Sequence, residues 1–138
     1  MKARRQTGFM LIEVLISVLI FSVGVVALVA LQAAMTKAQT EAKARADATN
    51  LAAELVGLMW SDIPNLGRYD STNCASYNAC NMWLSKVNET LPSAVANPPQ
   101  VSVVTTAGLT QGNVVIIIQW EFPNGDVRNY TMTTTVTI

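Results

Sequence analysis

Hydrophobic residues are concentrated near the start of the chain, in an almost unbroken apolar run over residues 9–31 that only one carboxylate, Glu13, interrupts. At a rise of about 1.5 Å per residue, a helix of this length extends about 34 Å, which is sufficient to cross a hydrocarbon core of about 30 Å. The basic residues Lys2, Arg4 and Arg5 predict that the N-terminus stays in the cytoplasm and that the rest of the chain lies outside. The pattern therefore predicts a single membrane-spanning helix.

The helical pattern continues beyond this run. Residues 32–56 contain neither proline nor glycine and are rich in alanine, lysine, glutamate and leucine, all of which favour helix. Because the residue before a proline avoids helical geometry, Pro64 limits the helix, and we expect one helix of about fifty residues that ends near Asp62. Steps of three and four residues predict a buried stripe on this helix. The stripe consists of Leu31, Met35, Ala38, Ala42, Thr49, Ala53, Val56 and Trp60.

A polar segment over residues 63–82 follows the helix and is expected to form a loop. It contains Cys74 and Cys80, between which a disulfide is the favoured state outside the cytoplasm, where conditions are oxidising. The chain has no histidine and only these two thiols, so we expect no metal site. A short helix is predicted over residues 81–91, before Pro92. Its apolar face consists of Trp83, Leu84, Val87 and Leu91.

Three β-strands are predicted in the last third of the chain, over residues 100–106, 113–122 and 126–138. The second is the strongest, because nearly all of its residues are β-branched or aromatic. Asn124-Gly125 is a strong signal for a two-residue hairpin turn between the second and third strands. We therefore expect an α+β fold in which a long N-terminal helix packs on a small antiparallel sheet of about three strands.

Alternation assigns the strand residues to two faces. The face expected to pack on the outer half of the helix consists of Val114, Ile116, Ile118, Trp120, Phe122, Tyr130, Met132, Val136 and Ile138. The opposite face of the last strand consists of Thr131, Thr133, Thr135 and Thr137. We expect this threonine row to be solvated, and a surface that binds a partner is the alternative.

The composition argues against several classes of function. Nine basic and nine acidic residues balance, and the few basic residues after Asp62 form no stripe, which argues against strong binding of nucleic acid. Because the chain contains no histidine, histidine-based acid–base catalysis and nucleophile activation are excluded. The sequence also lacks a glycine-rich phosphate-binding loop. We expect a protein that is not an enzyme and that uses no cofactor.

A cut between Gly8 and Phe9 would explain why a carboxylate, Glu13, lies in the apolar run. The cut would place a new α-amino group one helical turn before the carboxylate, at a spacing at which the two charges can meet. The carboxylate is also favoured at the positive end of the helix dipole. Glu13 is then neutralised by the amine of its own chain or by that of a neighbouring chain. The second option makes it an assembly contact inside a membrane.

The order of a basic leader, Gly8, Phe9 and then Met10-Leu11-Ile12-Glu13-Val14 resembles the class III signal of type IV pilins and pseudopilins. Met10 departs from the threonine that is usual at its position. The resemblance implies that a prepilin peptidase cuts after Gly8 and methylates the amine of Phe9. It also implies that Glu13 pairs with the N-terminus of another subunit in a growing filament, and that the chain has a pilin-like fold.

Within this family, residues 24–32, the alanine-rich helix after them, the two central cysteines and the strand segment 116–120 resemble the PilV group of type IV pilus minor pilins. The resemblance implies a subunit of a tip or priming complex, with other minor pilins, the major pilin and the inner-membrane assembly platform as partners. Residues 1–8 would then be the leader and residues 9–31 the membrane half of the helix. Residues 32–138 would be a periplasmic domain that later joins the pilus.

Three alternatives stay open on the sequence. A minor pseudopilin of a type II secretion system shares the leader, the helix and the small sheet. A tip subunit that binds a ligand or DNA would need exposed basic or aromatic groups in its loops, for which the candidates are Arg68, Tyr69 and Tyr77. A conventional signal peptide cut after Ala27 would leave Glu13 without a reason in the apolar core.

Overall fold

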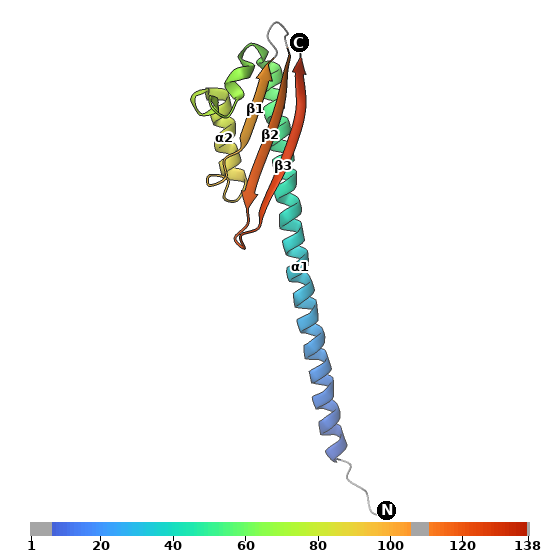
Figure 1. Cartoon of the computed structure of the whole chain (residues 1–138). Helices are drawn as coiled ribbons and strands as arrows, with labels where there is room; N and C mark the ends of the chain where they lie inside the picture. The colour runs from blue at the N-terminus through green and yellow to red at the C-terminus, as the bar shows by residue number, and fades with distance from the viewer. Residues whose placement is uncertain (1–6, 106–110, 138) are drawn as a thin grey trace, which may run out of the picture. The chain divides into compact units, whose positions relative to one another are not determined.

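The computed structural model describes residues 7–105 and 111–137, and the contacts divide the chain into two compact units, Met1–Glu41 and Ala42–Ile138. Helix α1 (Thr7–Ser61) contributes residues to both units and ends where the sequence predicts. The second unit also contains a short helix and a sheet, so the expected α+β fold is confirmed (Figure 1).

The sheet has three antiparallel strands in the order β1-β2-β3. The strands are β1 (Gln100–Thr105), β2 (Gln111–Glu121) and β3 (Val127–Thr137). In their register, Ile116 of β2 lies between Val101 of β1 and Met132 of β3. The three predicted strands are thus confirmed, and their predicted ends at residues 106 and 138 lie outside the described residues.

One face of the sheet packs on one face of α1 and forms the core of the second unit (Figure 1). The sheet contributes Val101, Val114, Ile116, Ile118, Trp120 and Val136, all of which are buried. Helix α1 contributes Ala44, Ala48, Leu51, Ala52, Leu55 and Met59. The inner face predicted for the sheet is confirmed, with Phe122, Tyr130 and Met132 half-buried at its margin. Ile138, which was also assigned to this face, lies outside the described residues.

The stripe predicted to be buried on α1 is wrong. Its exposed members are Leu31, Met35, Ala38, Ala42, Thr49, Ala53 and Trp60. The helix carries two stripes with steps of three and four residues, and the sheet covers the other one, which runs from Ala44 to Met59. Alanine is abundant on both stripes, so it does not distinguish them. The large apolar side chain of Trp60 made the first stripe look like the buried one, but this side chain is 45% exposed. Periodicity alone does not say which of two such stripes lies under a sheet.

The segment predicted as a loop contains three short helical elements. Two 3₁₀ helices, η1 (Ile63–Tyr69) and η2 (Cys74–Ser76), precede helix α2 (Asn78–Thr90), which begins before the predicted residue 81. The predicted apolar face of α2 is confirmed, since Trp83, Val87 and Leu91 are buried, and Leu84 is half-buried.

The hairpin between β2 and β3 differs from the predicted two-residue turn. The Phe122 amide donates to the Asp126 carbonyl (3.1 Å), and the Gly125 amide donates to the Phe122 carbonyl (2.8 Å). The loop therefore consists of Pro123, Asn124 and Gly125, with Gly125 in the left-handed region at φ 82°. Proline explains the difference, because Pro123 lacks the amide that a two-residue turn would place in the strand ladder.

Candidate functional site

The first unit contains an exposed apolar helix. By length and composition α1 can cross a membrane, and no other helix in the described residues passes that test. The Gly8–Phe9 bond lies within the first turn of α1, which begins at Thr7. Phe9 is 78% exposed. The predicted cleavage site and the apolar run thus lie on one helix.

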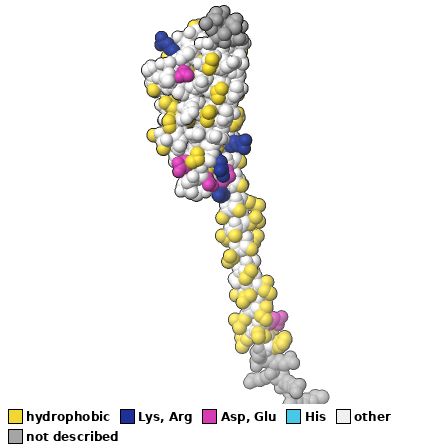
Figure 2. Space-filling model, viewed as in Figure 1, with side chains coloured by type: hydrophobic (Ala, Val, Ile, Leu, Met, Phe, Trp, Pro, Cys, Tyr) yellow, Lys and Arg dark blue, Asp and Glu magenta, His cyan; other side chains and the backbone are white. Residues whose placement is uncertain are grey.

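Glu13 is exposed on this helix, one turn after Phe9. Figure 2 shows acidic atoms beside the hydrophobic side chains of this segment. The Ser17 hydroxyl donates to the backbone carbonyl of Glu13 (2.8 Å), while no side chain in the described ranges pairs with the Glu13 carboxylate. A carboxylate at the bilayer centre costs about 2.5–3.5 kcal/mol, and less near the interface. Inside a membrane this group therefore favours a cation as its partner.

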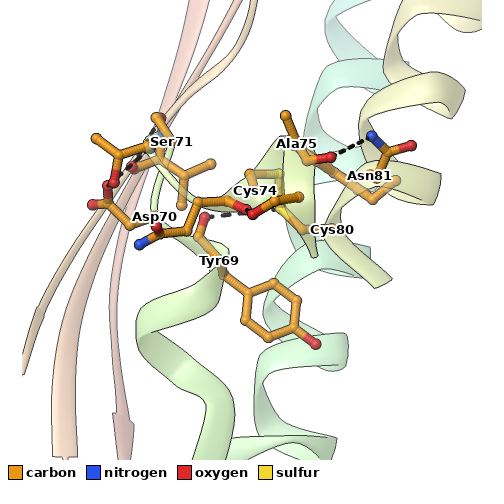
Figure 3. Close-up of a disulfide and its surroundings, with 12 residues drawn as sticks. Tyr69, Asp70, Ser71, Cys74, Ala75, Cys80 and Asn81 are labelled. Atoms are coloured by element: carbon orange, nitrogen blue, oxygen red, sulfur yellow. Dashed lines mark hydrogen bonds between the residues drawn. A yellow bond between two sulfur atoms is a disulfide. The ribbon is translucent and has the colours of Figure 1, made fainter. Parts of the chain in front are cut away.

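The second unit contains the disulfide that the sequence predicts. Cys74 and Cys80 are joined, with their Cα atoms 5.0 Å apart, and both residues are buried. The bond connects η2 to the first turns of α2. There the side-chain amide of Asn81 also donates to the backbone carbonyl of Ala75 (2.8 Å), as Figure 3 shows. Closing so short a loop limits the unfolded chain and contributes about 2–3 kcal/mol in the chain-entropy model.

Helix α2 is attached to α1 by two side-chain contacts. The Trp83 indole donates to the backbone carbonyl of Leu51 (2.8 Å) in the buried core. On the surface, the Lys86 ammonium lies 2.6 Å from the Glu54 carboxylate. The disulfide-bonded segment is therefore fixed to the helix that carries the sheet.

A cluster of polar side chains lies where α1 ends. The Asp62 carboxylate accepts hydrogen bonds from the hydroxyls of Tyr77 and Tyr69 (3.2 Å for Tyr69) and from the amide of Asn65 (2.8 Å). The two tyrosine rings meet edge to face, with centroids 5.3 Å apart, and the Arg68 guanidinium lies 5.5 Å from the centre of the Tyr77 ring. The cluster connects the end of α1 with η1 and with the loop that the disulfide closes.

The hydrogen bonds of this cluster fix its protonation states. The hydrogen bond from Tyr77, followed by that from Asn65, lowers the pKa of Asp62. Burial, and then the hydrogen bond to Asp62, raises the pKa of Tyr69, and the bond to Asp62 also raises the pKa of Tyr77. Both phenols therefore stay protonated as donors at neutral pH, and Asp62 stays ionised as the acceptor.

Two of the side chains named as candidates for binding a ligand are engaged within the fold. Tyr69 is buried, which corrects its assignment as an exposed loop residue, and Tyr77 is half-buried with its hydroxyl on Asp62. Beside the disulfide lies a hollow of about 90 Å³, and its lining includes Trp83, Pro99 and Val101. Pockets for small ligands measure about 300–1,000 Å³, so this hollow is too small for one.

Comparisons of the chain with protein-family models, with curated protein sequences and with solved structures find no match. The described residues also contain no group of three or more His, Cys, Asp or Glu side chains that is placed to hold a metal ion. The Asp62 cluster was missed in the sequence, because its members become neighbours only through the 3₁₀ turns of η1 and η2. The candidate site is thus a carboxylate on an apolar helix, without a partner among the described side chains, and a cross-linked globular unit follows it in the chain.

Proposed function

We propose that the chain is a minor pilin of a type IV pilus, processed by a prepilin peptidase and incorporated in a tip or priming complex that promotes pilus assembly. The observation that carries the proposal is the Glu13 carboxylate, which is exposed on an apolar helix one turn after Phe9 and has no partner among the described side chains. An amine at Phe9 of another subunit would supply the cation that this carboxylate favours inside a membrane.

The architecture supports this proposal. A long N-terminal helix packed on a three-stranded antiparallel sheet, with a disulfide, is the arrangement that a pilin-like fold implies. The apolar segment of α1 would hold the uncut and the cut chain in the inner membrane, and the globular unit would lie in the periplasm. Similarity of fold alone does not establish function, whereas Glu13 and the residues around it are specific to the proposed assembly contact.

The exposed stripe of α1 in the second unit also favours assembly. It consists of Ala42, Ala46, Thr49, Ala53 and Trp60, and no member is charged. Small side chains allow another helix to approach closely, and a tryptophan beside them adds apolar area that a contact can bury. Ala42, Thr49, Ala53 and Trp60 of this surface belong to the stripe that periodicity marks in the sequence, and the sheet leaves them uncovered.

In the proposed mechanism, the peptidase removes residues 1–8 and creates the amine of Phe9. The apolar helices associate laterally in the membrane, where the low dielectric strengthens attraction between a carboxylate and an amine. Glu13 of one subunit then pairs with the N-terminus of another, and the globular units pack on their neighbours. The pair directs the order of assembly, because a subunit without a partner leaves a charge in the apolar phase.

The substitution Glu13→Ala tests this role. We expect the variant to be processed normally, because the cleavage site is intact, and its recovery with the major and minor pilins to fall by about tenfold or more, the loss of one charge pair in a low dielectric. Quantitative mass spectrometry of complexes purified through the solubilised subunit measures this recovery. Glu89→Ala removes an exposed carboxylate of α2 that has no hydrogen bond or ion pair among the described side chains and is the control.

Normal recovery of pilins with Glu13→Ala would remove the proposed role of Glu13. If the wild-type chain is recovered with subunits of a type II secretion system in place of pilins, it is a minor pseudopilin and the pilus assignment is wrong. The same purification therefore separates the two assemblies that share this leader and fold.

A further inference from the structure

The two outer edges of the sheet differ in whether another segment of the chain forms hydrogen bonds with them. The edge of β1 is covered by the segment before η2: the Ser71 amide donates to the Val101 carbonyl (2.9 Å), and the Val101 amide donates to the Ser71 hydroxyl. Farther along, the Val103 amide donates to the Asp70 carboxylate (3.3 Å). Three polar groups on the outer edge of β1 thus have partners within the chain.

The outer edge of β3 has no such cover. β3 is 11 residues long and pairs with β2 alone, and no backbone hydrogen bond from another described segment reaches its other side. After Arg128, the strand contains no charged residue, no proline and no glycine up to Thr137. Natural proteins protect long edge strands with charges, prolines, bulges or covering loops, because an open edge pairs with other strands. Beyond Arg128, the described part of the chain gives β3 none of these protections.

The register shows which backbone groups are open. Phe122 and Asp126 are hydrogen-bonded across the hairpin, and hydrogen-bonded pairs alternate with non-bonded pairs along an antiparallel ladder. Counting from this pair along the register, Ile118 and Tyr130 are bonded to each other, as are Ile116 and Met132. The backbone groups of the residues between them therefore point away from β2. The open residues are Asn129, Thr131, Thr133 and Thr135.

The side chains beside this edge define what can be added to it. On the packed face Tyr130 and Met132 are only half-buried, so apolar surface is left uncovered next to the edge. On the other face the side chains of Thr131 and Thr133 are exposed, and both are small and uncharged. A strand with alternating apolar and small polar residues would continue both faces. A charged residue placed on the packed face beside Met132 would lose its hydration without a partner.

We propose that the outer edge of β3 binds an extended, uncharged segment of a different pilus subunit, which pairs antiparallel with residues 129–135 through the backbone. An antiparallel strand is favoured, because the sheet is antiparallel throughout and this pairing is slightly more stable per residue. The inference rests on the proposed function, since it takes its partner from the assembled pilus, and it adds a contact of the globular unit to the contact made by Glu13. Recognition of this kind gives affinity through main-chain hydrogen bonds.

The test replaces Thr133 in the full-length chain and measures recovery with pilus subunits as above. Thr133→Pro removes an amide on the open edge and leaves the ladder to β2 intact, whereas Thr133→Ala keeps that amide and is the matched control. We expect recovery with Thr133→Pro to fall by about tenfold or more and recovery with Thr133→Ala to stay at the wild-type level. Thr131→Lys places a protective charge on the edge strand and gives a second variant if the proline disturbs folding.

The proposal is overturned if Thr133→Pro and Thr131→Lys both recover pilus subunits at the wild-type level. It is also overturned if recovery falls as much with Thr133→Ala as with Thr133→Pro. It is also overturned if the purified wild-type chain alone forms a dimer in detergent that Thr131→Lys abolishes, because the occupant is then a second copy. If the wild-type chain is recovered without any pilin, the proposed function fails and the edge contact fails with it. Normal recovery of pilins by the wild type and by both edge variants overturns the edge contact alone.

Discussion

Asp62 connects three segments through one carboxylate. Its hydrogen bonds come from Asn65 and Tyr69 in η1 and from Tyr77 at the start of α2, so one side chain organises the end of α1. The disulfide closes the loop that contains Tyr77 and restricts where its hydroxyl can lie. Hydrogen bonds to a charged group contribute more than neutral ones, which makes this cluster the main polar contact of the region.

The contribution of Asp62 to stability is expected to depend on pH. Its pKa in the folded chain is lower than the value of about 3.9 in an unfolded chain, so the contribution is complete above about pH 5 and is lost as the pH falls through the folded-state pKa. The free energy of unfolding of Asp62→Asn should be lower than that of the wild type at about pH 6, and the difference should shrink toward about pH 2. Urea unfolding in detergent, followed by the fluorescence of the buried Trp83 and Trp120, measures both values.

The control for this measurement is Glu89→Gln, which removes an exposed carboxylate with no hydrogen bond among the described side chains. A difference between Asp62→Asn and the wild type that stays constant over the same pH range would contradict the role given to Asp62. At this scale the sequence indicates the disulfide partners and marks Glu13 by its isolation. It does not indicate Asp62 and Tyr77 as partners, because they are 15 residues apart and meet only through the path of the 3₁₀ turns.

At the scale of elements, α1 shows what periodicity can and cannot predict. The length and the end of the helix follow from its composition and from Pro64, and both are confirmed. The choice between its two apolar stripes depends on which side the sheet covers, and this is a tertiary contact. Alanine on the covered side allows the sheet to approach closely, as the complete burial of Ala48 and Ala52 shows.

A pair of leucine substitutions tests this assignment. Ala48→Leu inserts methyl groups into the packed contact under the sheet and should lower the free energy of unfolding by about 1–3 kcal/mol. Ala46→Leu makes the same change on the exposed side of α1 and should alter it by no more than about 0.5 kcal/mol. Urea unfolding in detergent compares the two variants. Equal destabilisation by both, or a larger effect of Ala46→Leu, would contradict the observed stripe.

The strands follow from the sequence pattern, whereas the hairpin turn and the open edge do not. Strand positions and faces follow from β-branched residues and alternation, and the structure confirms them. The turn does not, because Pro123 changes which residues belong to the loop. The open edge of β3 could not be inferred from the sequence, since it depends on the order of the strands and on the segment that covers β1.

At the scale of the whole chain, the α+β class follows from a few strong signals. One long helical pattern and three strand patterns predict a sheet that covers part of the helix, and the second unit has this arrangement. The chain divides into an exposed apolar unit and a packed unit, and the helix of the first unit is long and apolar enough to cross a membrane. In the proposed function, the cut between Gly8 and Phe9 would create the amine that pairs with Glu13.

The most direct test of this claim is the mass of the mature N-terminus. The chain is purified from cells that contain a prepilin peptidase, and its N-terminal peptide is sequenced by mass spectrometry. We predict a chain that begins at Phe9 and carries one methyl group on its α-amine. A chain that retains Met1 and the leader, or that begins at residue 28 after a conventional signal cut, would contradict the account.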